Sequence, residues 1–140
     1  MCEMYRFSLV EYKVTKLNFS VNEEFENDKD SGKTEILPEL GINYIKNKDL
    51  VSVNLSIKFS KSSAPFLLST VLTGMFKFDV DTTDKEIEKI VYINISAILF
   101  PFLREVVADI TMRAGFSPLL LPPMNFVEAY QQKKQNLKTN

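Results

Sequence analysis

Residues 50–60 read Leu-Val-Ser-Val-Asn-Leu-Ser-Ile-Lys-Phe-Ser, and from Val51 onward apolar side chains alternate with polar ones without a break. Successive side chains of a β-strand point to opposite faces, so this alternation predicts a strand with one buried face and one wet face. A break at residues 61–65, Lys-Ser-Ser-Ala-Pro, leads into residues 66–80, which are rich in Phe, Val, Leu and Thr. The two runs predict a β-hairpin and therefore an antiparallel sheet.

Two further strands are expected before this hairpin. Residues 5–21 alternate in the same way, but the phase of the alternation changes twice, which favours one long strand with one or two bulges. The second of these strands, within residues 36–45, carries Leu40, Ile42 and Tyr44 on one face. The acidic, polar stretch of about residues 22–35 that separates them is interpreted as an exposed crossover loop.

The C-terminal half changes to helical spacing. Thr83, followed three residues later by Glu86, fits a capping box that starts one helix. Ser96 is expected to start a second helix, which ends near Gly115. Strands followed by helices predict an α+β fold: a four-stranded antiparallel sheet followed by two main helices, in a single domain over residues 1–140.

A short last helix is expected at the C-terminal end. Asn125 and Glu128 form a second capping pair, which would open it. The tail that follows, about residues 132–140, is basic and polar, and we expect it to fray.

The composition excludes most kinds of enzyme chemistry. The 140 residues include no His and only one Cys, which rules out His-activated nucleophiles, His-ligated zinc, internal disulfides and thiolate clusters. The four glycines are isolated, so no glycine-rich phosphate loop can form. A net charge of −1 argues against nucleic acid as the main partner. We expect no catalytic residues, no metal and no cofactor.

The chain is expected to be a cytoplasmic protein. Its longest uncharged stretches, residues 62–76, 90–103 and 114–127, are 14 or 15 residues long and are interrupted by Asn, Ser, Thr or Pro. A membrane span needs about 20 apolar residues, so these stretches are interpreted as core segments. The first residues carry neither a basic start nor an apolar run, so no signal peptide is expected.

An apolar loop near the C-terminus is unusual. Residues 116–124 contain five large apolar side chains held between three prolines, whereas a surface connection is normally polar. Two interpretations remain open: the loop lies on the sheet as core, which composition alone favours, or it lines a hydrophobic binding surface.

Three stretches in this C-terminal third resemble the signatures of one protein family. They are Ile98-Leu-Phe-Pro-Phe-Leu-Arg-Glu105, Arg113-Ala-Gly-Phe116, and Leu119 to Phe126, which ends in Pro-Pro-Met-Asn-Phe. In this order they are similar to the ILFPYARE, RGTFP and LNLAPVNF motifs of the SecB family of molecular chaperones. The likeness is carried by residues 90–130; before them only the order and lengths of the strands agree.

The resemblance implies an ATP-independent holdase that keeps non-native proteins, typically presecretory ones, unfolded in the cytosol. It implies a homotetramer, a dimer of dimers in which sheets pair edge to edge and the long helices pack between dimers. Unfolded clients would lie in hydrophobic grooves between the crossover strand and the loop and lid before the last helix. Carried over by position, the groove residues are Leu40, Ile42, Tyr44, Phe116, Leu119, Leu121, Met124 and Phe126.

One departure from the family pattern bears on partners. Export-linked members dock the motor ATPase SecA through acidic residues on the exposed sheet face, but the corresponding positions here are Lys16, Ser20 and Ser69. The missing carboxylates argue against a SecA complex. Two alternatives to a general export chaperone therefore stay open: a chaperone dedicated to the antitoxin of a toxin–antitoxin system, and a scaffold subunit whose groove is filled.

Overall fold

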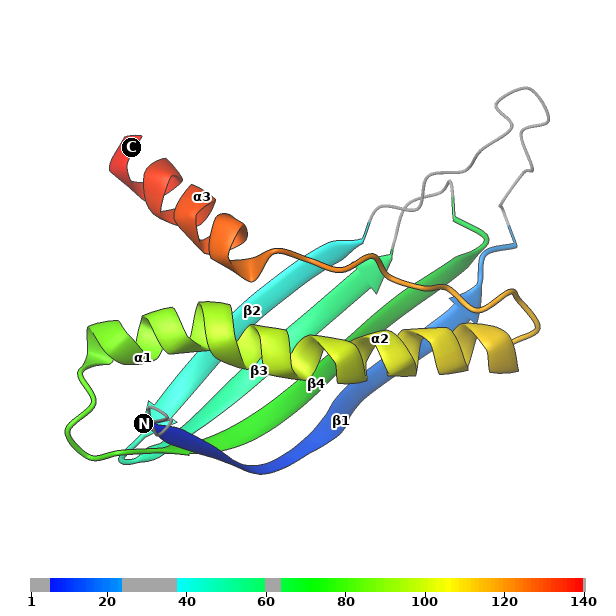
Figure 1. Cartoon of the computed structure of the whole chain (residues 1–140). Helices are drawn as coiled ribbons and strands as arrows, with labels where there is room; N and C mark the ends of the chain where they lie inside the picture. The colour runs from blue at the N-terminus through cyan, green and yellow to red at the C-terminus, as the bar shows by residue number, and fades with distance from the viewer. Residues whose placement is uncertain (1–5, 24–37, 60–63, 140) are drawn as a thin grey trace.

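The computed structural model describes residues 6–23, 38–59 and 64–139, with side chains as far as residue 135. Its sheet has four strands in the order β1-β4-β3-β2, and every neighbouring pair is antiparallel (Figure 1). The strands are β1 (Phe7–Val21), β2 (Glu39–Asn47), β3 (Leu50–Phe59) and β4 (Phe66–Phe78). The helical elements follow: α1 (Asp84–Ile90), η1 (Val91–Ile95), α2 (Ser96–Arg113) and α3 (Phe126–Thr139). The α+β expectation is confirmed.

The alternation in residues 50–60 is seen directly in the burial of β3. Its inner row of five side chains is buried and forms the centre of the core: Val51, Val53, Leu55, Ile57 and Phe59. The two phase changes in β1 are register irregularities against β4, one between Leu9 and Glu11 and one between Val14 and Lys16. Each irregularity inserts an extra residue, which keeps the apolar side chains of β1 on the inner face. The crossover loop expected at about residues 22–35 lies mostly outside the described residues.

The helical layer differs from the expected pair of separate helices. α1, η1 and α2 form one continuous helix, and η1 is a π-helical segment in its middle. Ser96 does not cap a new helix; its buried hydroxyl donates to the carbonyl oxygen of Val91, 2.9 Å away. Continuous helical hydrogen bonding outweighed the local capping preference of Ser96.

The wider π turn has a packing reason. The buried positions of the continuous helix recur every four residues. On an ideal α-helix, residues with this spacing are offset by about 40° around the helix axis at each step, so the buried stripe would turn away from the sheet. A π segment carries more residues per turn, so it offsets part of that rotation and keeps the stripe facing the sheet. The stripe consists of Ile87, Val91, Ile95, Leu99, Leu103, Val107 and Thr111.

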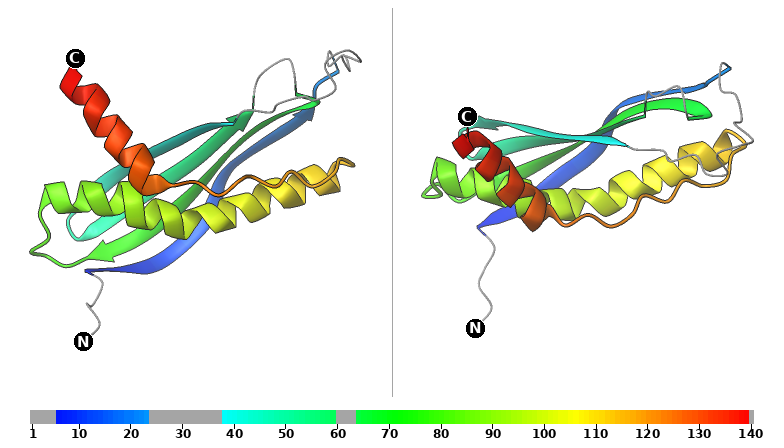
Figure 2. Two further views of the ribbon diagram at one scale, coloured as in Figure 1. Left: turned by 45° about the horizontal axis from the view of Figure 1, so that its top comes forward. Right: turned by 90° about the horizontal axis from the view of Figure 1, so that it is seen from above.

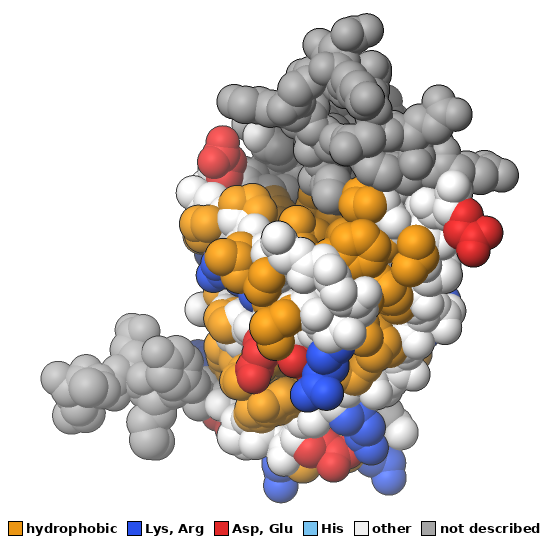
Figure 3. Space-filling model, turned by 90° about the vertical axis from the view of Figure 1, so that its right-hand side faces the viewer, with side chains coloured by type: hydrophobic (Ala, Val, Ile, Leu, Met, Phe, Trp, Pro, Cys, Tyr) orange, Lys and Arg blue, Asp and Glu red, His pale blue; other side chains and the backbone are white. Residues whose placement is uncertain are grey.

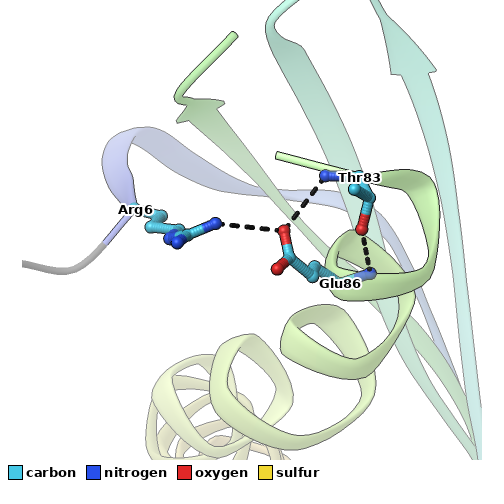
Figure 4. A network of polar contacts seen from close by, with 3 residues as sticks. All are labelled: Arg6, Thr83 and Glu86. Atoms are coloured by element: carbon cyan, nitrogen blue, oxygen red, sulfur yellow. Dashed lines mark hydrogen bonds and ion pairs between the residues drawn. The ribbon is translucent and has the colours of Figure 1, made fainter. Parts of the chain in front are cut away.

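The predicted capping box at the start of α1 is confirmed (Figure 4). The Thr83 hydroxyl accepts from the backbone N–H of Glu86 at 3.2 Å, and the Glu86 carboxylate accepts from the backbone N–H of Thr83 at 3.1 Å. The same carboxylate oxygen also receives a hydrogen bond of 3.1 Å from the guanidinium of Arg6, the residue before β1. This network joins the first strand to the start of the helical layer.

The helices cover one face of the sheet and leave the other face open (Figure 2). Close packing between the layers is visible at Gly74 of β4, where a Cβ atom would lie 2.8 Å from the Phe76 ring and 3.0 Å from a Leu99 methyl group. On the open face, hydrogen bonds of 2.7–2.8 Å connect side chains from all four strands: Asn43, Asn54, Thr73 and Thr15.

The last helix extends further than the sequence pattern predicts. We expected fraying from about residue 132, but the backbone of α3 stays helical to Thr139. Tyr130 is buried, and the Lys133 ammonium lies 3.5 Å above the ring of Tyr92. These two contacts hold the middle of α3 against η1.

The continuous helix from Asp84 to Arg113 is long and apolar enough, by length and composition alone, to cross a membrane. Its apolar stripe packs on the sheet, with Leu99, Leu103 and Val107 fully buried. We therefore interpret it as the helical layer of the core.

Leu99 provides a test of this packing. Leu99→Ala is expected to lower the free energy of unfolding by about 2–5 kcal/mol, because it leaves a cavity between α2 and β4. Ile98→Ala removes a neighbouring side chain that is 38% exposed, and it should cost less than about 1 kcal/mol. Urea unfolding monitored by circular dichroism measures both. Equal losses would show that the helix does not rest on the sheet through Leu99.

Candidate functional site

The first wall of the expected groove is present on β2. Leu40, Ile42 and Tyr44 are half-buried on the inner face of this edge strand and pack against the margin of the core. Period-2 spacing puts them on one face, and the sheet order leaves β2 without a strand beyond it within the described sheet. Their apolar surfaces are therefore partly available to a binding partner.

An inner pocket of about 250 Å³ lies between β2 and α3. Of the expected groove residues, Leu40, Ile42 and Phe126 take part in it. The complete lining is Leu40, Ile42, Tyr92, Phe126, Ala129, Tyr130 and Lys133. The volume accommodates one large side chain.

A column of aromatic rings borders the inner pocket. Tyr44 meets Tyr92 edge-on with ring centroids 6.2 Å apart, and Tyr92 stacks on Tyr130 at 5.8 Å. Burial raises the pKa of the Tyr44 phenol above its ordinary value of 10.0, and the negative charge of Glu88 raises it further. The phenol therefore stays neutral near pH 7.

Four lining residues were missed by sequence reasoning: Tyr92, Ala129, Tyr130 and Lys133. Tyr130 and Lys133 are three residues apart, so they share one face of a helix. That spacing would have been a signal if the last helix had been expected to run past residue 132. Tyr92 lies in the π-helical segment η1. The local sequence pattern did not predict this segment, so it could not place Tyr92.

An outer pocket of about 500 Å³ shares Phe126 with the inner pocket and is otherwise formed by other residues. Phe126 itself is only 6% exposed and packs edge-on against Phe100 with ring centroids 5.5 Å apart. Met124, another expected groove residue, is 40% exposed here. The outer pocket is lined by Ile93, Ala97, Pro123, Met124, Asn125, Phe126 and Val127, none of them charged.

The apolar loop of residues 116–124, which we call the proline loop, combines the two roles left open above. Leu121 is only 3% exposed and belongs to the core, whereas Leu120 is 72% exposed. Leu119 is half-buried against the core. Phe116 lies against Phe66 at 5.4 Å and lines neither pocket. Of the eight expected residues, the inner and outer pockets thus include Leu40, Ile42, Met124 and Phe126.

The positions that correspond to the motor-docking face lie on the open side of the sheet. Ser20 and Ser69 line a shallow hollow of about 540 Å³ at one end of β1 and β4, together with Lys58 of β3. Lys16 is on β1, opposite Val71 of β4. No carboxylate lines this hollow within the described part of the chain.

The described acidic side chains do not gather into a metal site. No three Asp, Glu, His or Cys residues lie close enough together to hold an ion in residues 6–23, 38–59 and 64–139. The chemistry that the two pockets offer is apolar contact with an aromatic border and one ammonium group.

Comparison with known proteins gives a family match over most of the chain. The family model described as "SecB: Preprotein translocase subunit SecB" matches residues 19–137. A "Protein-export protein SecB" of Nitrosomonas europaea is 40% identical over 75 residues, 54% of this chain and 46% of the relative. Another, from Neisseria meningitidis, is 32% identical over 85 residues, 61% of this chain and 57% of the relative. The matches thus span about half the length of these curated relatives.

A solved structure has the same fold. The Mycobacterium tuberculosis Rv1957 SecB-like chaperone, solved in complex with a ChAD peptide from the Rv1956 HigA1 antitoxin, superposes with a TM-score of 0.66. The match covers 85% of this chain and 91% of that one at 16% sequence identity. The family match over residues 19–137, together with this agreement in fold, leads to one conclusion: the chain belongs to the SecB family.

Proposed function

We propose that this protein is an ATP-independent chaperone that binds unfolded polypeptides through the apolar surfaces around Phe126. The observation that carries the proposal is the pair of pockets that share Phe126 in their lining and are lined almost entirely by uncharged side chains. Membership of the SecB family supports it. We propose a cytoplasmic protein that performs no enzymatic reaction and needs no cofactor.

The energetics suit a holdase. Burial of one client Leu or Phe side chain contributes roughly 1.5–3 kcal/mol, and the cost of ordering the client consumes much of it. Single contacts are therefore weak and tolerant of sequence. Useful affinity arises when one unfolded chain occupies several pockets at once, because each contact raises the effective concentration for the next.

Such multivalency requires several copies, and β1 offers a surface for them. β1 is an edge strand, and its inner face leaves large apolar side chains exposed. Hydrophobic side chains are also exposed at the end of the molecule where β1 and α2 end, the right-hand side of Figure 1 (Figure 3). The exposed set on the inner face of β1 is Leu9, Tyr12, Val14, Leu17 and Val21. We propose that other copies cover this surface in a homotetramer.

A second candidate is a chaperone dedicated to one client, such as an antitoxin. The docking positions favour it, because Lys16, Ser20 and Ser69 offer no carboxylate to an export motor. A scaffold subunit with a filled groove is less well supported. Although Leu121 and Phe126 are buried, Leu40 and Ile42 still face an open pocket.

Ile42 and Ile45 allow a matched test of client binding. They lie on opposite faces of β2: Ile42 lines the inner pocket, and Ile45 is 68% exposed on the open face. Ile42→Ser should weaken binding of reduced, carboxymethylated α-lactalbumin about tenfold, since it removes apolar contact area. Ile45→Ser should bind as the wild type does. Fluorescence anisotropy without nucleotide measures both, and equal affinities would place the client elsewhere.

The wild-type protein should also suppress light scattering by a denatured client in the absence of ATP. If aggregation proceeds unchanged at equimolar chaperone, the holdase proposal is wrong and the scaffold alternative gains support.

Assembly can be tested through β1. Sedimentation should give a mass of about four times the 16.1 kDa of one chain. Val14→Arg places a charge on the 41% exposed apolar face of β1 and is expected to yield a smaller species. Ile45→Arg introduces the same charge on the other edge strand and should leave the mass unchanged. The opposite pattern would assign the interface to β2.

The docking face predicts weak binding of SecA. Titration calorimetry should give no measurable heat with the wild type at micromolar concentrations. Lys16→Glu combined with Ser20→Glu and Ser69→Glu should strengthen any interaction by restoring negative charge. A tight wild-type complex would contradict the prediction and favour the export role.

A further inference from the structure

Thr111 is a polar residue at a position where the buried stripe of α2 would otherwise be apolar. It is fully buried, and its hydroxyl donates to the carbonyl oxygen of Val107 at 2.9 Å. The oxygen of the same hydroxyl accepts the backbone N–H of Leu119, also at 2.9 Å. The side chain therefore joins the last turns of the helix to the proline loop.

The backbone of Thr111 makes a second contact with the proline loop. α2 ends at Arg113, and the chain reverses through Gly115, whose φ of +97° is favourable for glycine. This reversal brings the N–H of Phe116 to within 3.0 Å of the carbonyl oxygen of Thr111. One residue thus receives two hydrogen bonds from the loop, one on its main chain and one on its side chain.

The proline loop has few other backbone restraints. Pro118, Pro122 and Pro123 have no N–H to donate. Within the described part of the chain, the loop N–H groups that find a protein acceptor are those of Phe116 and Leu119, and both acceptors belong to Thr111. Beyond these bonds, packing of apolar side chains such as Leu121 holds the loop.

We infer that Thr111 is a positioning residue for client binding: its hydroxyl fixes the proline loop, and through it the Pro123–Met124 wall of the outer pocket. The inference rests on the proposed holdase function. If this wall is already ordered in the free protein, the free energy of client binding is not reduced by the cost of ordering it. Without the hydroxyl, the half-buried N–H of Leu119 loses its acceptor and the loop samples other positions.

The test replaces the hydroxyl without changing the size of the side chain. Thr111→Val is isosteric, and Thr111→Ser restores the hydroxyl alone. Thr111→Val should accelerate hydrogen exchange at Leu119 and raise the Kd for reduced, carboxymethylated α-lactalbumin about fivefold, chiefly through faster dissociation. Thr111→Ser should restore both exchange protection and affinity. If Thr111→Val does not fold, Thr111→Ala supplies the hydroxyl-free variant.

A core variant separates positioning from general stability. Val107→Ala, one turn earlier on the same stripe, should lower Tm and leave client Kd unchanged. Faster exchange at Leu119 with an unchanged Kd in Thr111→Val would overturn the inference while leaving the holdase function intact. Equal losses of affinity in Val107→Ala and Thr111→Val would also overturn it. Failure of the wild type to bind the client would instead overturn the proposed function.

Discussion

The structure depends on one contact: the apolar stripe of the continuous helix packs against the inner face of the sheet. Leu99 and Leu103 are fully buried in this contact, as are Leu55 of β3 and Leu72 of β4. Helix and strands each have a single apolar face, so neither is stable in water without the other. Because one helix covers the middle of the sheet, both edge strands keep apolar surface that is only partly covered.

The two edges are used differently. Beside β2, the chain returns through the proline loop and α3, which leaves the inner pocket between α3 and the strand. Among the described side chains of α3, Phe126 and Tyr130 are buried and the Lys133 ammonium lies over the ring of Tyr92. Beside β1, the apolar row stays 41–55% exposed, although Tyr12 within it stacks on Phe102 of α2. The proposed client contacts and the proposed contacts between copies are therefore separated by the width of the sheet.

The sequence predicted those parts of the fold that depend on short-range periodicity. The alternation in β3, the bulged β1 and the capping box at Thr83 are all found in the structure. Local pattern could not show that the helix continues through Ser96, because that depends on how a stripe with four-residue spacing meets a sheet formed by distant residues.

The candidate site was predictable only in part, for the same reason. The resemblance indicated Leu40, Ile42 and Phe126, which line a pocket, but also Phe116, which packs against Phe19 of β1 and Phe66 of β4 instead. Tyr92 and Tyr130 come from elements far apart in sequence and meet only when α3 folds back. The spacing of residues within one segment cannot predict a contact between two segments that are far apart in the sequence.

The chain of hydrogen bonds from Asn43 to Thr15 gives the molecule two unlike sides. The amide and hydroxyl groups in this row hydrogen-bond to one another and remain in contact with water. They therefore offer few unpaired donors or acceptors to another polypeptide. A protein that keeps apolar surface accessible to clients is prone to nonspecific self-association. The hydrogen-bonded row crosses all four strands of the open face, whereas most of the exposed large apolar side chains lie on the helical side, so capture of a partner has a preferred direction.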